Sequence, residues 1–453
     1  MRLLPLRIHA PWARALIVAL LFLYGSGAFG CRILAETDYP RQLFRRTVEG
    51  DAKAVDVLLD YGVDPARPYA EGVTPLHMAR VTGRTDLQVL LESHGADPGD
   101  TPPRPEAMAK VLFAALSADG PGMAALVALD GAIQFEGYHG LANAQHEVPV
   151  TADTPFRIAS LTKPFTAAAI LALAEEERLD VDDPLSKHLP YYPGGDAITL
   201  RHLLTHSAGI PNYTAKPEFL ERASLPWTPE EIAALFKDEP LEFEPGERYS
   251  YSNSGYYLLG QIVEEVTGKP FEAYLSKRFF EPLGMRHTGM HDPRAILPNG
   301  AQGYTVETGV LKNAQEWHTP NAGGAGGMYS TVRDLHRWTQ ALFHGDLLTR
   351  ESLEGVFEGV FMGDVPPEGL PEGLPAYGHG WVITEHRGLP MLNHMGGLPG
   401  FTSIMAHYPK QGLTVVVLSN CAPPHDLSPE RVLLTLAQCF LWEAMEEAQD
   451  GGG

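Results

Sequence analysis

The stretch FRIASLTKPFTAAAILAL, from Phe156 to Leu173, places a serine and a lysine three residues apart at the start of a helix-forming run. Residues three apart on a helix share a face, so the amine of Lys163 would come within reach of the Ser160 hydroxyl. A serine hydroxyl attacks poorly unless a neighbouring group activates it, and a helix N-terminus supplies free N–H groups where an oxyanion would form. The pair therefore predicts an activated nucleophile. The alternative is a helix-starting serine beside a solvated lysine.

A tyrosine and an asparagine lie two residues apart in RYSYSNSGYYLLG, Arg248 to Gly260, just before another helix-forming run. A tyrosine whose pKa of about 10 is lowered by a neighbouring cation can act as a general base, and Lys163 could supply that charge. The Asn253 amide both donates and accepts hydrogen bonds, so it could orient Lys163 and a substrate amide. We therefore assign Tyr251 to proton transfer and Asn253 to binding, with amphipathic packing as the alternative for the tyrosine.

A glycine pair follows a histidine in NHMGGLPGF, Asn393 to Phe401, a segment expected to be the middle one of three adjacent strands. Glycine allows the backbone to approach a ligand closely, so Gly396 and Gly397 predict a strand edge at the site. A free N–H there would complete an oxyanion hole with the N–H of Ser160. The alternative interpretation of the glycines is a turn.

Taken in chain order, the motifs S-L-T-K, Y-S-N and H-M-G resemble those of the serine beta-lactamase and penicillin-binding protein superfamily. The likeness extends from about Pro121 to Trp442 and is closest to class C beta-lactamases, D-alanyl-D-alanine carboxypeptidases, D-aminopeptidases and related esterases. It implies an α+β fold over residues 107–445, in which helices flank an antiparallel sheet and a helical subdomain is added. A hairpin expected at Asp130-Gly131, between two apolar runs, would open that sheet.

The resemblance also implies a role for each motif residue. Ser160 would be the acylated nucleophile, and Lys163 and Tyr251 would handle its proton. The other expected roles are contact with lysine and substrate for Asn253, a cationic or hydrogen-bonding group for His394, and the second oxyanion donor for the backbone of Gly397.

Met395 departs from the pattern of the family. Many penicillin-recognising members carry Thr or Ser at this place, and that hydroxyl helps to hold the substrate carboxylate, so we expect an uncharged ester or amide substrate here. The resemblance implies a serine hydrolase that cleaves an ester, amide or peptide-type bond in a small molecule or peptide through an acyl-enzyme, with no metal or organic cofactor. A true class C-type beta-lactamase and a non-catalytic scaffold are the alternatives. His202 and His206 lack a third ligand at a suitable spacing, so we expect them to be structural.

The first thirty residues have the features of an export signal. Three arginines precede an apolar run from Ala15 to Tyr24, and small residues lead up to Cys31. The run is too short to span a bilayer, and cleavage before Cys31 would leave a cysteine that is a candidate for lipidation. We therefore expect a periplasmic, membrane-anchored or secreted protein. An oxidising compartment would allow Cys421 and Cys439 to pair, and two buried thiols are the alternative.

Residues 38–99 contain an internal repeat. DYGVDP at Asp60 recurs as SHGADP at Ser93, thirty-three residues later, and TPLH begins at Thr74. The period and the TPLH motif resemble ankyrin repeats, in which the histidine, here His77, hydrogen-bonds the turn. A solenoid generally needs more than two repeats to close a hydrophobic core. We therefore expect these two to pack against the following domain or a protein partner. A linker at 100–106 and a disordered tail at 446–453 complete the expected organisation.

The formal net charge of the chain is -22. An acidic surface disfavours nucleic acid and anionic membrane surfaces as partners.

Overall fold

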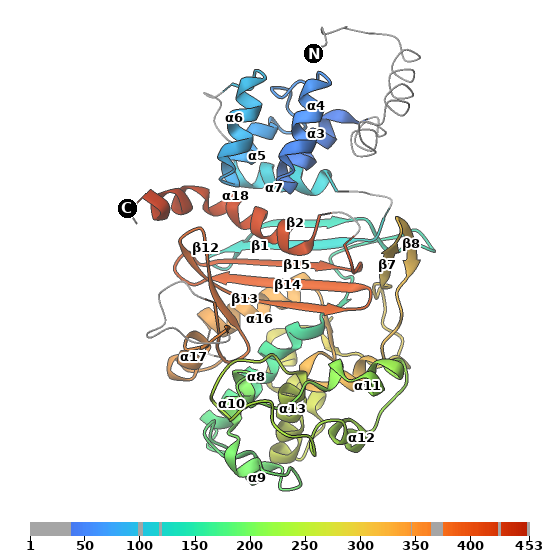
Figure 1. Ribbon diagram of the computed structural model, residues 1–453, viewed down its shortest axis with the longest axis vertical. Coiled ribbons are helices and arrows are strands. Elements are labelled where there is room, and N and C mark those ends of the chain that lie inside the picture. The colour runs from blue at the N-terminus through green and yellow to red at the C-terminus, as the bar shows by residue number, and fades with distance from the viewer. Residues whose placement is uncertain are drawn as a thin grey trace. The chain divides into compact units, whose positions relative to one another are not determined.

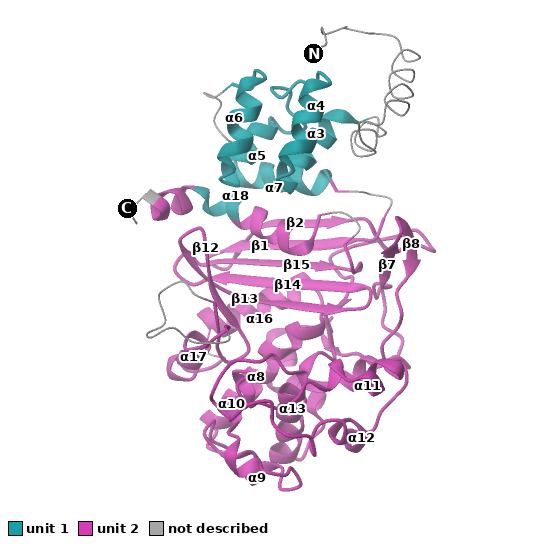
Figure 2. Cartoon of the chain, in the orientation of Figure 1, with its two compact units in different colours: residues 1–115, 438–442 teal, residues 116–437, 443–453 magenta. Residues whose placement is uncertain are grey.

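The computed structural model describes residues 38–97, 103–116, 120–345, 347–363, 375–424 and 427–450. The chain forms two compact units (Figure 2): unit 1 takes Met1–Ala115 and Gln438–Trp442, and unit 2 takes Leu116–Ala437 and Glu443–Gly453. The expected signal peptide and Cys31 lie outside the described residues. None of the helices in the described ranges is both long and apolar enough to cross a membrane.

Unit 1 contains two helix pairs that repeat along the chain. Its helices are α3 (Tyr39–Glu49), α4 (Ala52–Asp60), α5 (Pro75–Val81), α6 (Thr85–Ser93) and α7 (Pro105–Ala114). Helix α6 begins and ends thirty-three residues after α4, which matches the period of the sequence. Leu58 and Leu91 occupy equivalent positions in the two pairs, and both are fully buried in one shared core.

Local capping explains where these helices begin. The Asp51 side chain accepts a hydrogen bond from the Ala54 N–H at 3.0 Å at the start of α4. At the start of α5, the Thr74 hydroxyl accepts from the His77 N–H at 3.3 Å, and the His77 Nδ1 accepts from the Thr74 N–H at 3.0 Å. The expectation that His77 hydrogen-bonds the turn is confirmed.

Unit 2 is built on an eight-stranded sheet in which all neighbouring strands are antiparallel (Figure 1). In spatial order the strands are β10 (Val360–Phe361), β11 (Ala376–Tyr377), β12 (Val382–His386), β13 (Leu389–Leu398), β14 (Phe401–Tyr408), β15 (Leu413–Ser419), β1 (Met123–Leu129) and β2 (Ala132–His139). Asp130 and Gly131 join β1 to β2 with positive φ angles of 47° and 79°, as expected of a two-residue hairpin. The predicted hairpin is confirmed.

Helices cover this sheet, and α8 (Thr162–Glu175), α10 (Leu200–Leu204) and α13 (Asn253–Thr267) gather below it in Figure 1. Helix α8 is buried from Thr162 to Leu173, as its apolar composition on every face requires. The amphipathic helix α16 (Val332–His344) packs against β1 and β15. The predicted α+β architecture, with helices around an antiparallel sheet, is confirmed.

The remaining elements of unit 2 are short. Its short helices are α9 (Leu185–His188), α11 (Pro217–Glu221), α12 (Pro229–Ala234), α14 (Phe271–Leu275), α15 (Glu281–Leu283) and α17 (Arg350–Phe357). Three small sheets pair β3 (Leu141–Asn143) with β4 (Val148–Pro149), β5 (Phe156–Arg157) and β6 (Gly289–Met290) with β9 (Met328–Ser330), and β7 (Tyr304–Glu307) with β8 (Val310–Asn313).

Two boundaries differ from those expected from the sequence. Helix α7 belongs to unit 1, where the Arg41 Nε donates to the Ala115 carbonyl at 3.0 Å, so the expected domain start at residue 107 falls inside that helix. The last helix, α18 (Pro429–Asp450), continues past residue 446, where a disordered tail was expected. Alanine, methionine and glutamate favour helix, which explains why α18 extends this far. Cys421 and Cys439 are both buried and remain thiols.

Candidate active site

Ser160 lies in a single turn, Ala159–Leu161, between strand β5 and helix α8. The preceding residue, Ala159, has a φ of 50°, in the left-handed region that residues other than glycine rarely adopt. Such strain costs about 1–3 kcal/mol and persists only where the surroundings impose it. It places the Ser160 hydroxyl at the N-terminal end of α8, where the sequence predicts the nucleophile.

Lys163 is fully buried, and its amine has three oxygen contacts. The Nζ atom lies 2.8 Å from Asn253 Oδ1, 2.8 Å from the Ala325 carbonyl oxygen and 3.1 Å from Ser160 Oγ. Burial lowers the Lys163 pKa well below its ordinary value of 10.5, which favours the neutral amine. Because the two carbonyl oxygens can only accept, the two N–H groups of a neutral amine would point at them. The lone pair of the amine then remains for the Ser160 proton.

The Tyr251 hydroxyl donates to Ser160 Oγ at 2.9 Å, and its ring centre lies 4.8 Å from Lys163 Nζ. Burial raises the pKa of Tyr251 above its ordinary value of 10.0, and the hydrogen bond with Ser160 offsets this only partly. The expectation that Lys163 lowers the pKa of this phenol is therefore wrong. Burial of the phenol is the largest influence on its pKa, and Lys163 does not offset it.

A chain of hydrogen bonds fixes the orientation of the Asn253 amide. The Asn212 Oδ1 atom accepts from the Asn253 N–H at 3.1 Å and from the Thr214 hydroxyl at 3.0 Å. Because Thr214 gives its proton to Asn212, its oxygen accepts from Asn253 Nδ2 at 2.8 Å, and the Asn253 oxygen must face Lys163. Sequence reasoning missed Asn212 and Thr214. The only sequence signal for them is the N-Y-T turn, in which the Asn212 oxygen also accepts from the Thr214 N–H at 3.4 Å.

We expect Thr214→Val to lower kcat for an ester substrate by about 10–100-fold, because the Asn253 amide loses the acceptor that holds its oxygen toward Lys163. Thr214→Ser keeps the hydroxyl and should restore most of the rate. Steady-state kinetics, with thermal melting of each variant as a control, separate positioning from a loss of stability. An equal loss of kcat in Thr214→Val and Thr214→Ser would contradict this positioning role.

Strand β13 brings its glycines to the nucleophile. A Cβ atom at Gly396 would lie 2.2 Å from the Ile158 carbonyl oxygen and 3.0 Å from the Ser160 nitrogen, so only glycine fits this close approach. The Ser403 hydroxyl on β14 also donates to the Ile158 carbonyl, at 2.7 Å. Gly397 is the next residue along β13 and has open space where a Cβ would be. Both glycines thus lie where a strand edge at the site was expected.

His394 lies on β13 but points away from open space, with 3% of its surface exposed. Its Nδ1 donates to the Met395 carbonyl at 2.7 Å, so its Nε2 accepts from the Tyr377 hydroxyl at 2.8 Å. Burial, reinforced by the nearby Lys163, lowers the His394 pKa to about 3. His394 is therefore neutral with both ring nitrogens engaged, so of the two expected roles, cationic or hydrogen-bonding, the contacts fit the hydrogen-bonding one. The Met395 side chain is 42% exposed, on the opposite face of the strand.

Comparison with known proteins assigns the chain to a family. The model of the family "Beta-lactamase" matches residues 109–438. The chain belongs to the beta-lactamase family.

This beta-lactamase family member is similar in sequence or structure to penicillin-binding proteins and to an amidase. Penicillin-binding protein 4* of Bacillus subtilis is 30% identical over 339 residues, covering 70% of this chain and 71% of that protein. A penicillin binding protein from Bacillus halodurans matches with a TM-score of 0.60 and 29% identity over 69% of this chain and 94% of its own. D-amino acid amidase from Ochrobactrum anthropi SV3 matches with a TM-score of 0.63 and 27% identity, over 72% and 95% of the two chains. The fold is of the beta-lactamase and transpeptidase type, and the protein is a serine hydrolase of this superfamily.

In this beta-lactamase family member, Ser160, Asn253 and Gly397 line one cavity of about 160 Å³, hereafter the Ser160 cavity. Its wall includes Phe219 and Trp317, whose ring centres lie 5.6 Å apart in an edge-on arrangement. No lysine or arginine is among its lining residues. His394 and Met395 do not line it either. The cavity is therefore small and partly aromatic, and its lining offers no lysine or arginine to a substrate carboxylate.

The two histidines in TLRHLLTH have structural roles in this beta-lactamase family member. The His202 Nδ1 accepts from the Thr199 N–H at 3.2 Å at the start of α10, repeating the cap that His77 forms. The His206 Nδ1 accepts from the Ser252 N–H at 3.2 Å, and its ring centre lies 4.3 Å from that of Tyr251. His206 therefore supports the segment that carries the Tyr251 phenol.

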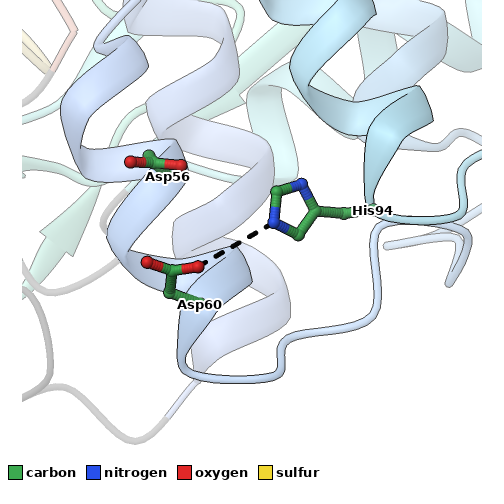
Figure 3. Close-up of side chains that lie close together, drawn as sticks. All are labelled: Asp56, Asp60 and His94. Carbon is green, nitrogen blue, oxygen red and sulfur yellow. Dashed lines mark ion pairs between the residues drawn. The ribbon is translucent and has the colours of Figure 1, made fainter. Parts of the chain in front are cut away.

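One group of three side chains in the described ranges could offer atoms to a metal ion (Figure 3). The ligand atoms of Asp56, Asp60 and His94, all exposed, lie within 4.8 Å of one another. The His94 Nδ1 lies 3.0 Å from the Leu90 carbonyl oxygen, and the other ring nitrogen faces Asp60 Oδ1 at 3.9 Å. We interpret this contact as a surface ion pair between α4 and α6.

Proposed function

We propose that the protein hydrolyses small uncharged esters or amides through an acyl-enzyme on Ser160. The observation that carries the proposal is the convergence of two groups on one oxygen. The Lys163 amine lies 3.1 Å and the Tyr251 hydroxyl 2.9 Å from Ser160 Oγ. An alcohol with a neutral amine at hydrogen-bonding distance has a base ready to take its proton.

In the first step, Ser160 Oγ attacks the substrate carbonyl carbon while its proton moves to the neutral Lys163 amine. The N–H groups of Ser160 and Gly397 stabilise the negative oxygen of the tetrahedral intermediate. Tyr251 gives its proton to the leaving oxygen or nitrogen, and the Lys163 ammonium returns a proton to the phenolate. Water then attacks the acyl group in a second step that runs through the same groups in reverse.

The substrate class follows from the lining of the Ser160 cavity. A beta-lactam or a peptide C-terminus carries a carboxylate, which needs a cation or several hydrogen-bond donors when it loses water. The cavity has no lysine or arginine, and burial keeps His394 neutral. The D-amino acid amidase among the structural neighbours supports an amide or ester in place of a beta-lactam.

A side-by-side assay tests this function. We expect 4-nitrophenyl acetate to be hydrolysed fastest, a D-amino acid amide more slowly, and a chromogenic cephalosporin least, each rate being corrected with Ser160→Ala protein. Cephalosporin turnover above that of the ester would favour the alternative of a class C-type beta-lactamase. Rates equal to the Ser160→Ala blank for all three substrates would favour a non-catalytic scaffold.

We also propose that the helix pairs of unit 1 are ankyrin repeats that serve as a docking or stabilising module. Their thirty-three-residue period and the T-P-L-H cap support this assignment. Leu58→Ala, in the core of these pairs, should destabilise them by about 2–4 kcal/mol, seen as faster amide exchange in α4 and α6. The ester kcat/KM should stay unchanged, and a parallel loss of activity would argue against a separate module.

Export, with lipidation at Cys31, is proposed from the sequence of the first thirty-one residues. A membrane fraction that keeps the protein after Cys31→Ser would contradict a lipid anchor at this cysteine.

A further inference from the structure

A second cavity in unit 2, of about 620 Å³, has a composition unlike that of the Ser160 cavity. We call it the His291 cavity, after its most buried polar group. Tyr257 and Phe271 supply aromatic surface, and four prolines line it as well. A hollow of this size with aromatic and proline walls is large enough for a small organic molecule.

His291 lines this cavity with an imidazole that is 9% exposed. Its Nδ1 has no hydrogen-bond partner, although its backbone N–H is held by the Gly327 carbonyl at 2.8 Å. Burial lowers the His291 pKa to about 4, so the ring is neutral near pH 7. Buried polar atoms are nearly always hydrogen-bonded, so an unpartnered one in a side chain that lines a cavity is unusual.

The charges around the His291 cavity are mainly negative. Glu264 accepts from the Phe271 N–H at 2.8 Å and Glu272 from the Met290 N–H at 3.2 Å, so backbone groups hold both carboxylates in place. Neither glutamate pairs with a basic side chain in the described part of the chain. Arg294, the one guanidinium in the lining, forms a two-pronged contact with Asp292 at 3.1 and 3.2 Å. The unpaired charge of the lining is therefore that of the two glutamates.

We propose that the His291 cavity binds an organic cation, an ammonium group on an aromatic or apolar body, and that its occupancy changes the rate at Ser160. Glu264 and Glu272 would attract the ammonium charge, and the aromatic walls would enclose the apolar body. The neutral ring of His291 would form part of the wall against which the ligand packs.

The segment Thr319–Ala325 connects the two cavities. Gly323 and Gly324 line the His291 cavity, whereas Ala325 lines the Ser160 cavity and its carbonyl oxygen holds Lys163 at 2.8 Å. Gly323 has a φ of 47° and a ψ of -133°, and a Cβ there would lie 3.1 Å from the Tyr257 ring. A ligand that displaces Tyr257 would therefore change the packing against Gly323, two residues from the carbonyl that orients the proposed base.

The probe for binding is N,N-dimethyl-2-phenylethylammonium, a tertiary amine that cannot accept the acyl group. Calorimetry on the full chain carrying Ser160→Ala, which needs no reactive serine, should show binding that is at least about fivefold tighter than that of uncharged 2-phenylethanol. The double variant Glu264→Gln and Glu272→Gln keeps both backbone contacts and should weaken binding by roughly tenfold. Glu264→Gln alone should weaken it less, and Glu265→Gln, one residue along α13 and outside the cavity, should not.

A rate measurement tests the coupling. Saturating probe should change kcat for 4-nitrophenyl acetate by about twofold or more in the wild-type protein, and by much less in the double variant. The site would be overturned by probe binding that is absent, that is no tighter than binding of the alcohol, or that is insensitive to the glutamate substitutions. A kcat that is unchanged with bound probe would overturn the coupling. Because calorimetry needs no turnover, failure of the proposed hydrolase activity would not mimic failure of this site.

Discussion

Replacing Ser160 with alanine is expected to lower kcat/KM for 4-nitrophenyl acetate by about 10⁴-fold or more, because no other side chain among the described residues offers an oxygen to both Lys163 and Tyr251. The same change should abolish covalent labelling by a phosphonate, which mass spectrometry of the intact protein detects as an added mass. Ester hydrolysis and phosphonate labelling both require a covalent bond to Ser160 Oγ, so both should be lost in the same variant.

The control for this change is Ser207→Ala. Ser207 is a buried serine whose hydroxyl lies 2.9 Å from that of Thr205, and within the described part of the chain it forms no hydrogen bond with Ser160, Lys163 or Tyr251. This variant should keep phosphonate labelling. Labelling that persists in Ser160→Ala would show that another residue is the nucleophile and would remove the basis of the proposed mechanism.

Lys163→Met should lower kcat by about 10³-fold, because methionine fills the space without offering a base. Lys163→Arg should be equally inactive, since a guanidinium stays protonated. In the wild-type protein, kcat/KM should rise with pH as the Lys163 amine loses its proton. This rise should occur well below pH 10.5, because burial lowers the Lys163 pKa from that value.

The same pKa shift predicts how stability depends on pH. The unfolded chain restores the Lys163 pKa to about its ordinary value, so between the two pKa values the unfolded state binds more protons than the folded state. The free energy of unfolding therefore rises with pH across this window and falls as the pH drops toward the lowered pKa. Urea unfolding at about pH 6 and about pH 9 should show a larger gain for the wild type than for Lys163→Met. Equal gains would mean that Lys163 is charged in the folded protein.

Contacts that depend on local geometry could be predicted from the sequence. The close spacing of Ser160 and Lys163 brings them together across the turn that leads into α8, and the turn at Asp130-Gly131 determines the first hairpin in the same local way. The three motifs meet at one site because they are characteristic of a known fold. The contact between Asn253 and Lys163 was expected on that basis, and the structure places these two groups 2.8 Å apart.

Properties that depend on burial could not be predicted from the sequence. The pKa of Tyr251 rises instead of falling because the phenol and Lys163 are both removed from water, which no local pattern reveals. Thr214 acts on Asn253 from another loop, so only the folded chain shows their hydrogen bond. The glycine-rich segment from Gly323 to Gly327 has no sequence pattern that predicts the hydrogen bond between the Ala325 carbonyl and the Lys163 amine.

The pairing of β1 with β15 determines when the hydrolase unit can finish folding. Met123 lies opposite Ser419 on paired strands of the sheet, and these neighbours are separated by almost the whole unit in the sequence. Contacts between such distant segments form slowly, because a long loop must close first. During synthesis, the ribosome must therefore release β15 before this sheet is complete, and co-translational folding can supply only its separate parts.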